Sequence, residues 1–526
     1  MRRLTAICCF ALAAITVLAT PINSQQRSFA LRGGGTGVFL DGEADHTMIL
    51  RPAPDGRLRR ECIQGDRHVA AALLQSGDRV VAPETELDER VDYERVARAM
   101  VSATMRFDPD IPTGVDDAGR VLLYMPNPVE PGSSRSHFDP SANPDLLMEP
   151  FSSPDLPFNK VDVTDEALRD MGWRAGKFRA KFQFTDDDGT GFKDPVLGPA
   201  RRKALRFMLR VWGRLLGSAS KLTVAARFDD LSCSPAGATL AHVTPLFVAA
   251  EFRGGIPGVW YPGPMAESIV RADLSEADDP DIAITFNAAI DEGCMGPGTG
   301  WYYGLDNNHP PQRVAFLPVA LHEMGHGLGF LNLMDLNTGA FFRGLPDILA
   351  TMTLDNRRNQ TWDELPGNKA RLKSLVRDGE VAFTGDKTRR DAKPLLRGAH
   401  VIQIIAPDNL AGTHIVGRAF FGPALDQAGL AGDLALADDG TATPTLACGP
   451  LVNGAEIAGK IAVVHRGDCL FVEKVKSAQD AGASGVVVVN NVEKRPIDMG
   501  GSDGSITIPA VMVTMQLGKQ IERRLV

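Results

Sequence analysis

The sequence predicts an α+β chain in which a larger mixed domain is followed by a smaller α/β domain. Two observations favour this fold class. A stretch of helical periodicity in the middle of the chain leads into an alternating strand, and near the C-terminal end a strand, a helix and a buried strand follow in close succession. With 526 residues and 44% hydrophobic content, the chain can bury more than one core.

The first 24 residues have the layout of a secretory signal peptide. Arg2 and Arg3 precede an apolar run from Leu4 to about Thr20, and a polar stretch follows. The run is short for a membrane-spanning helix, although an uncleaved anchor is the alternative. We therefore expect a secreted or periplasmic protein without membrane association after signal removal. A formal net charge of −9, with both signs interspersed, argues against nucleic acid as a partner.

Export makes the cysteines informative. The two cysteines of the signal leave with it, so five remain in the mature chain. In an oxidising compartment the expected disulfides join cysteines of the same module, Cys233 with Cys294 and Cys448 with Cys469, and Cys62 is left over. None of the five has the spacing of a cysteine-based metal site.

Residues 176–395 are expected to form the larger domain. Residues 200–218 place apolar side chains on one helical stripe and reach a stop at Gly217, which is typical of an amphipathic helix. The alternating stretch 221–228 and the apolar stretch 282–287 predict two strands. Residues 333–397 read as loops and short helices that could form the wall of a cleft.

A helix that contains His322 and His326 carries the clearest chemical signal. Histidines four residues apart project from one helical face and can present ring nitrogens to one tetrahedral cation, for which Zn²⁺ is the expected cofactor. Glu323 lies beside them, where it can act as a general base toward a metal-activated water. The pattern indicates hydrolytic chemistry.

Three glycines, Gly325, Gly327 and Gly329, lie in the same stretch. In an ordinary helix each would cost about 1 kcal/mol relative to alanine, so the backbone there must meet special demands. Gly329 suits a sharp turn that ends the helix.

The motif "HEMGHGLGF" at residues 322–330 resembles the active-site helix of metzincin zinc peptidases, whose longer pattern continues to a third histidine. Asn332 occupies that position here. In the leishmanolysin-like branch, the third histidine comes from a separate segment, shortly before the methionine of the Met-turn. Upstream, "GSSRSHFDPSANPDLLMEPF" holds such a pair, His137 and Met148. The resemblance implies that His137 completes the metal site and that Met148 forms the turn beneath it.

This third-ligand segment, expected at residues 111–175, precedes the catalytic helix, whereas in the family pattern it follows. Two explanations remain open: the gene is circularly permuted, or the segment is the remainder of a truncated preceding copy. His137 as an ordinary polar loop histidine is a further alternative. In that case Asp335 and Asp347 could supply oxygen ligands, although solvated loop carboxylates are commoner.

Residues 396–526 resemble the protease-associated (PA) domain, mainly in "GKIAVVHRGDCLFVEKVKSAQDAGASGVVVVNN" and "ITIPAVMVT". The pattern predicts a strand at 460–464, a helix with Phe471, Val475 and Ala478 on one face, and a buried strand from Gly485. His465 is expected in a turn at a strand end. The resemblance implies a role in substrate access or partner binding.

These resemblances imply a secreted zinc-dependent endopeptidase that acts on proteins or peptides. The alternative is a catalytically inactive secreted binding protein that uses its PA domain. Residues 25–110 form either a removable pro-segment or a small cap. Cys62, which lies in that stretch, is either an inhibitory metal ligand or an ordinary thiol. The oligomeric state stays open.

Overall fold

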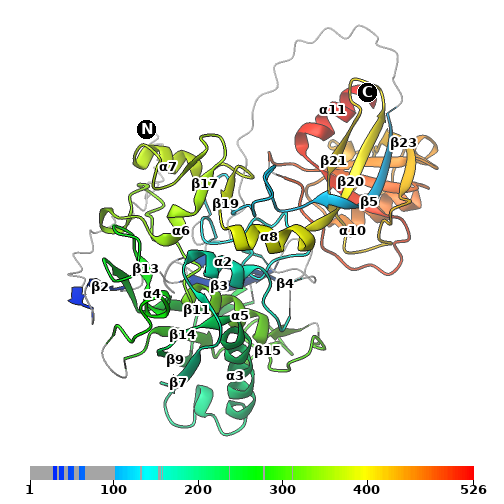
Figure 1. Cartoon of the computed structure of the whole chain (residues 1–526). Helices are drawn as coiled ribbons and strands as arrows, with labels where there is room; N and C mark the ends of the chain where they lie inside the picture. The colour runs from blue at the N-terminus through cyan, green and yellow to red at the C-terminus, as the bar shows by residue number, and fades with distance from the viewer. Residues whose placement is uncertain are drawn as a thin grey trace, which may run out of the picture.

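The computed structural model describes residues 28–31, 35–40, 46–52, 58–64, 101–130, 133–151, 156, 158–235, 237–275, 279–310, 312–493 and 495–525. Two bodies are visible, a larger one that carries most of the helices and a smaller one around the C-terminal strands (Figure 1). The expected signal peptide lies outside the described residues. Within the described ranges, no helix combines the length and apolar character needed to span a membrane.

The larger body is organised by a seven-stranded mixed sheet. Strands β9 and β14 are parallel, and so are β7 and β9, whereas β11 runs antiparallel to β14. From one edge to the other, the strands are β4 (Leu58–Gln64), β3 (His46–Pro52), β11 (Gly237–Pro245), β14 (Ile282–Asn287), β9 (Lys221–Asp229) and β7 (Arg179–Phe184), with β10 (Cys233–Ser234) paired to β11 off this path.

Two helices, α3 (Gly198–Leu215) and α5 (Phe316–Gly327), pack against this sheet and against each other. All residues of α5 are buried. The indole Nε1 of Trp212, on α3, donates to the carbonyl oxygen of Leu321 on α5 at 3.2 Å. A Cβ on Gly327 would lie 2.9 Å from Ile282 Cγ2 and 3.0 Å from Val243 Cγ2, so glycine lets α5 approach the sheet closely.

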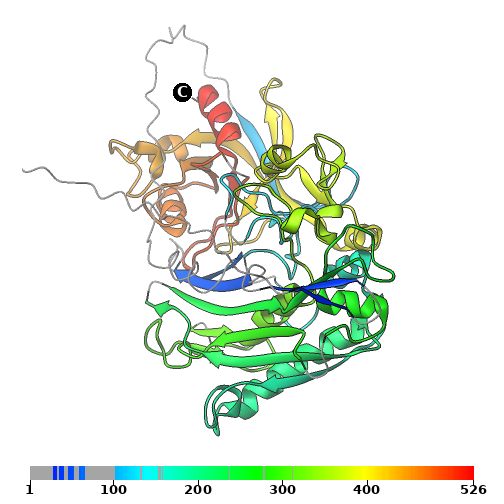
Figure 2. The same cartoon turned by 90° about the vertical axis from the view of Figure 1, so that its left-hand side faces the viewer.

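The N-terminal strands extend this sheet. β3 pairs antiparallel with β11, and β4 pairs antiparallel with β3, so a hairpin from the start of the chain forms the sheet edge next to α5 (Figure 2). The sequence analysis assigned this stretch to a pro-segment or a cap. In the structure, β3 and β4 of this stretch are paired at one end of the sheet.

Smaller elements surround the central sheet. One sheet consists of β1 (Ser28–Ala30), β2 (Thr36–Phe39), β12 (Phe247–Ala250) and β13 (Tyr261–Pro262), and others of β15 (Gly300–Tyr302) with β16 (Arg313–Ala315), β17 (Thr353–Asp355) with β18 (Gln360–Thr361) and β19 (Val381–Phe383), and β6 (Arg174–Ala175) with β8 (Leu216–Gly217). The remaining helices here are α2 (Thr164–Met171), α4 (Gly263–Val270), α6 (Ile348–Thr351), α7 (Asn368–Ser374), α8 (Asp386–Leu395), η1 (Gly191–Lys193) and η2 (Phe342–Gly344).

The third-ligand segment shares the core of the larger body. The core that contains α5 also contains Phe138, Leu147 and Met148. The ring of Phe138 lies 4.9 Å from that of Phe330, which follows α5. Nε1 of Trp173, at the end of the segment, donates to the carbonyl oxygen of Leu328 at 2.8 Å. The segment therefore packs with α5 in one core, as expected if both belong to the same domain.

The smaller body contains an eight-stranded sheet covered on both faces. Its strands, in order, are β21 (Gly412–Ile415), β20 (Arg397–Ala406), β5 (Ser102–Pro112), β23 (Leu430–Leu436), β24 (Ile461–His465), β25 (Gly485–Val489), β26 (Ala510–Val513) and β22 (Gly417–Arg418). The helices are α9 (Gly454–Ile457), α10 (Phe471–Asp480), α11 (Met515–Leu525) and the short η3 (Pro444–Leu446).

Alternation along the central strands explains why two helices cover this sheet. Ala462 and Val464 of β24 belong to the core that includes Val475 of α10. Ile461 and Val463 belong to a second core, which includes residues of α11. Successive side chains of a strand point to opposite faces, so each face requires its own cover. The predicted strand, helix and buried strand of this region are confirmed.

The position of one strand in this sheet does not follow the expected domain boundaries. β5 belongs to a stretch assigned partly to the N-terminal extension, yet it lies between β20 and β23. Arg397, where β20 begins, pairs with Pro112, where β5 ends. Two of the places where the chain passes between the bodies are therefore side by side. Both expected disulfides, Cys233–Cys294 and Cys448–Cys469, are confirmed.

A buried carboxyl group lies on α4. Glu267 is 1% exposed, and burial, with Asp281 nearby, raises its pKa to about 9. Its Oε1 accepts a hydrogen bond from the Leu274 amide at 3.0 Å, and its Oε2 accepts one from Ser220 Oγ at 3.4 Å. The folded protein therefore holds this group protonated at neutral pH, whereas the unfolded chain ionises it near its ordinary value.

We predict that Glu267→Gln reduces the loss of stability at rising pH. A raised folded-state pKa makes the free energy of unfolding of the wild type fall between about pH 4.5 and pH 9, by roughly 1 kcal/mol per pH unit in the middle of that window. Glutamine does not ionise; its carbonyl oxygen can accept from the Leu274 amide, and its amide nitrogen can donate to Ser220 Oγ. Denaturant unfolding at pH 5, 6.5 and 8 should show a variant advantage that grows with pH. The exposed Glu292→Gln should follow the wild type, and parallel pH profiles for Glu267→Gln would refute the prediction.

Candidate metal centre

Four buried side chains from three parts of the chain converge beside α5. The ligand atoms of Cys62, His137, His322 and His326 all lie within 4.8 Å of one another. The Nε2 atom of His326 is 3.2 Å from Nε2 of His137 and 3.2 Å from Nε2 of His322. The structure therefore brings together the three histidines that the sequence analysis singled out, and adds a cysteine.

Backbone carbonyls determine the tautomer of each imidazole. Nδ1 of His137 contacts the carbonyl oxygen of Ser133 at 2.9 Å, Nδ1 of His322 that of Leu147 at 2.7 Å, and Nδ1 of His326 that of Phe330 at 2.7 Å. A carbonyl oxygen only accepts hydrogen bonds, so each Nδ1 carries the proton. In a neutral ring, Nε2 then presents a lone pair. Three lone pairs consequently point toward one small volume.

Burial keeps the rings of His137 and His326 neutral. It lowers the pKa of His137 well below its ordinary value, and the neighbouring His322 and His46 add to the effect. Burial likewise lowers the pKa of His326, with His46, His137 and His322 contributing. Neutral imidazole is the form that binds metals.

The donor set and spacing fit Zn²⁺. Zinc binds imidazole nitrogen at about 2.0–2.1 Å in tetrahedral geometry, which places ligand nitrogens about 3.3 Å apart. The observed separations of 3.2 Å agree closely. Three lone pairs at this distance repel one another unless a cation lies between them, and each ring already has the outer hydrogen bond that orients metal-ligating histidines.

Glu323 lies on the same helix and is fully buried. Burial raises its pKa well above the ordinary value, and the backbone of Met48 in β3 opposes this rise. Within the described ranges, neither carboxylate oxygen has a hydrogen-bond partner of ordinary geometry. This carboxyl group can therefore exchange a proton with a small molecule placed beside the histidines, once β3 no longer covers it.

Met148 packs against α5 at Gly325, a residue that lies between the two histidines of the motif in sequence. A Cβ on Gly325 would lie 2.5 Å from Met148 Sδ, so only glycine at this position leaves room for the methionine. The preceding Leu147 supplies the carbonyl that orients His322. The turn thus supports both the helix and one of its rings. At Gly329, φ is +121°, which provides the expected sharp turn after the helix.

Asn332 and the two carboxylates considered as alternative ligands have structural roles. The backbone nitrogen of Asn332 donates to Ser136 Oγ at 3.1 Å, next to His137 in sequence, and its side-chain Nδ2 donates to Asp347 Oδ1 at 3.3 Å. Asp347 accepts hydrogen bonds from Leu333 N at 2.7 Å and, as the cap of α6, from Ala350 N at 2.9 Å. Asp335 accepts hydrogen bonds within its own turn. Both carboxylates lie outside the metal cluster.

The N-terminal hairpin contributes Cys62 to the cluster and packs His46 against it. Cys62 Sγ lies 3.4 Å from His326 Nε2, and the ring of His46 stacks on that of His326 with centroids 3.7 Å apart. The Cys62 amide donates to the Pro150 carbonyl at 2.9 Å, and Ser133 Oγ donates to the Cys62 carbonyl. The sequence indicated Cys62 only as one of two alternatives, an inhibitory metal ligand or an ordinary thiol, and gave no sign of His46, because neither residue lies in a spaced motif.

Residues 430–521 match the family model of the PA domain. The chain therefore contains a PA domain, as the resemblance in its C-terminal region implied. The match covers β23, β24, β25 and β26 of the smaller body's sheet and the helices that pack on them. The metal cluster lies outside the matched residues.

The curated relatives align over short stretches. Receptor homology region, transmembrane domain- and RING domain-containing protein 1 of Oryza sativa subsp. japonica is 41% identical over 86 residues, or 16% of this chain. Signal peptide peptidase-like 4 of the same organism is 34% identical over 87 residues, or 16% of this chain. Aminopeptidase YwaD of Bacillus subtilis is 35% identical over 71 residues, or 13% of this chain. The chain spans 16% of the length of each of these relatives.

Among solved structures, a zinc aminopeptidase from Bacillus subtilis is similar at 26% identity, covering 22% of this chain and 26% of that chain with a TM-score of 0.18. An aminopeptidase from Aneurinibacillus sp. strain AM-1 is similar at 25% identity, covering 22% and 26% with a TM-score of 0.17. TM-scores this low give no support for a shared overall fold, so the larger body is interpreted from its own structure alone.

We predict that Gly325→Ala destabilises the protein. The added methyl group would displace the buried Met148 side chain, and overpacking of this kind costs about 1–3 kcal/mol, partly offset by the better helix propensity of alanine. Gly454→Ala is the matched control because its Cβ would meet no atom closer than 3.8 Å. Equilibrium unfolding in denaturant measures both. Equal stability of Gly325→Ala and the wild type would contradict the close approach.

Proposed function

We propose that this chain is a zinc-dependent endopeptidase of the metzincin type, with the ligand arrangement of the leishmanolysin-like branch. His137, His322 and His326 bind the metal, Glu323 is the general base and Met148 forms the supporting turn. The observation that carries the proposal is the convergence of three Nε2 lone pairs, each oriented by a backbone carbonyl, beside a buried carboxyl group.

Zinc held by these nitrogens would polarise the scissile carbonyl and make the attacking water more acidic. Glu323 accepts the proton of that water and then delivers it to the nitrogen of the leaving amine. The position of Glu323 on α5, next to His322, keeps its carboxyl group close to the reacting atoms. The fully buried surroundings exclude bulk water and strengthen these electrostatic interactions.

The substrate would bind as an extended strand along β11. A peptide that adds to a sheet edge gains backbone hydrogen bonds, and its alternate side chains enter pockets. In this structure β3 occupies that edge, with Met48 next to Glu323. β3 continues on both sides of Met48. A site that holds the middle of a strand supports internal cleavage, as in an endopeptidase.

The same contact implies that the described form is latent. β3 covers Glu323, and Cys62 of β4 lies at the metal cluster. A thiolate is a strong zinc ligand and would fill the position that water or substrate needs. We therefore assign residues 25–110 to an inhibitory pro-segment, except for the part that forms β5. Displacement of the hairpin frees β11 and the fourth ligand position together.

Export fits this function. The two disulfides persist in an oxidising compartment, and the expected signal peptide would deliver the chain there. The PA domain, at the side of the third-ligand segment, would control access of protein substrates. The competing proposal is an inactive binding protein. The observation that favours it is the complete burial of Glu323.

We predict that Cys62→Ser raises casein cleavage by the full-length chain at least about tenfold. Loss of the thiolate ligand would remove about 1.4 kcal/mol or more from the closed form, so the open form becomes more populated. The double variant Cys62→Ser/Glu323→Gln serves as the control for contaminating peptidases and should be inactive. Equal rates for Cys62→Ser and the wild type would argue against inhibition by Cys62.

We also predict that Glu323→Gln separates metal binding from catalysis. In the Cys62→Ser background, both proteins should contain close to one zinc per chain by atomic absorption, while casein cleavage falls by about 10²- to 10⁴-fold because the general base is lost. His137→Ala should lower the affinity for zinc. If zinc is bound but the parent and Glu323→Gln proteins are equally inert, the binding-protein function gains support.

A further inference from the structure

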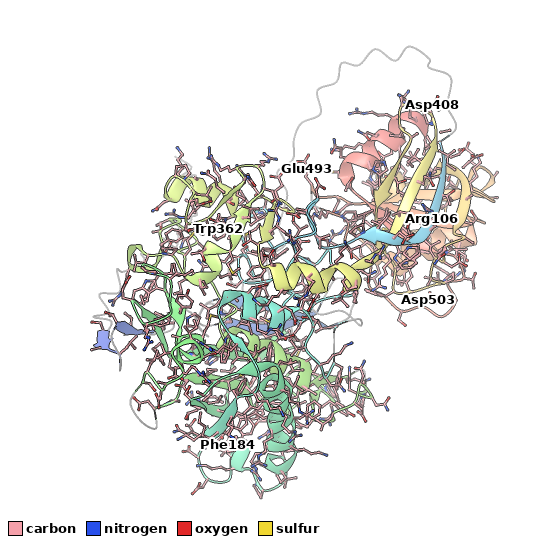
Figure 3. The ribbon with its side chains drawn as sticks, viewed as in Figure 1. Arg106, Phe184, Trp362, Asp408, Glu493 and Asp503 are labelled. Carbon is pink, nitrogen blue, oxygen red and sulfur yellow. A yellow bond between two sulfur atoms is a disulfide. The ribbon has the colours of Figure 1, made fainter. Side chains whose placement is uncertain are left out.

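An ion pair joins the PA domain to the segment that carries His137. Arg495 lies in the connection between β25 and β26, and its Nη1 donates to Asp139 Oδ1 at 2.8 Å and to Ser141 Oγ at 2.7 Å. Figure 3 labels Glu493, two residues earlier, at the side of the PA domain that faces the larger body. Arg495 and Asp139 both line a cleft of about 2270 Å³ between the two bodies.

The larger body is shaped to receive this guanidinium group. A Cβ on Gly379 would lie 1.5 Å from Arg495 Nη2, so any side chain at that position would fill the arginine's place. Gly379 has a φ of +72°, which glycine adopts at little cost. The neighbouring Asp378 places Oδ1 4.0 Å from Arg495 Nε. Arginine side chains that only rest on a surface lack such a recess.

Arg495 is the cationic partner of the buried Asp139 carboxylate. Its side chain is 2% exposed, whereas that of Arg495 is 36% exposed. A buried carboxylate is costly unless it is paired and hydrogen-bonded, and removing the partner of such a pair is strongly destabilising. The Ser141 amide also donates to Asp139 Oδ1, at 3.0 Å. Arg495 therefore stabilises the local conformation of this segment.

The backbone transmits that conformation to His137. Asp139 N donates to the Leu122 carbonyl at 2.9 Å, Tyr124 N donates to the His137 carbonyl at 2.9 Å, and Phe138 N donates to the Met148 carbonyl at 2.9 Å. Residues 137–139 are thus bonded on both sides as one short extended unit. A shift of Asp139 would move the imidazole of His137.

We propose that Arg495 is a positioning residue for the metal centre, through which the PA domain keeps the loop of the third ligand in place. This inference rests on the proposed function, because it assumes that His137 binds zinc. It assigns to the PA domain a direct effect on metal retention, separate from any effect on substrate access. A ligand bound in the cleft between the bodies would contact the same ion pair.

The test compares Arg495→Ala, Arg495→Lys and Arg418→Ala in the full-length chain. Arg418 forms an ion pair with Asp498 within the PA domain, so its variant is a matched control. The readouts are the rate of zinc transfer to a chromogenic chelator, the visible spectrum of the Co²⁺-substituted protein, and deuterium uptake of the peptide that covers residues 133–142.

Arg495→Ala should release zinc about 10- to 100-fold faster, as expected when an outer contact of a ligand is lost. Its Co²⁺ spectrum should change and its deuterium uptake rise. Arg495→Lys should restore part of all three effects, because lysine keeps the charge without the planar fork. Arg418→Ala should match the wild type in all three measurements.

Unchanged zinc release and deuterium uptake in Arg495→Ala would overturn this inference alone, since the wild type would still bind the metal. A wild type that takes up no zinc would overturn the proposed function and this inference together. If Arg495→Ala does not fold, Arg495→Lys decides the matter: zinc release at the wild-type rate would count against positioning by the arginine fork.

Discussion

Three hydrogen bonds from imidazole Nδ1 to backbone carbonyls are the constraint on which the rest of the structure depends. The acceptors lie in three different segments: Ser133 before the third histidine, Leu147 in the turn under α5, and Phe330 after that helix. Each bond sets a tautomer and a ring orientation, so the lone pairs converge only if all three segments are positioned to within a few tenths of an ångström. The packing around α5 can be understood as the means of achieving that precision.

The buried polar cluster also explains features of the core that would otherwise be costly. Imidazoles with facing lone pairs are unfavourable in an apolar interior without a cation, so the surrounding elements must hold them in place. Glycines on α5 allow this. Gly325 admits Met148, and Gly327 lets the helix approach Ile282 and Val243. Close packing on both sides fixes the helix, and with it His322 and His326.

The sequence predicted the parts of the site that depend on local geometry. His322, Glu323 and His326 share one helix, so their spacing alone indicated the chemistry. His137 is 189 residues from His326 and could be found only through a family resemblance. His46 escaped detection because its place at the cluster depends on how β3 pairs with β11. The position of β5 in the PA sheet was missed for the same reason, since strand register across long separations leaves no local signal.

For the assembly of the metal centre, the order of the segments along the chain is less important than the way in which the two bodies are joined. Two of the passages between them lie at Pro112 and at Arg397, and these two residues pair with each other. Where two passages are adjacent in this way, the packing of the other body can stay the same whichever strand comes first in the sequence. The third-ligand segment, which follows β5 directly, therefore starts beside the end of α8 and reaches the same core as α5. A permuted order is compatible with an intact centre for this reason.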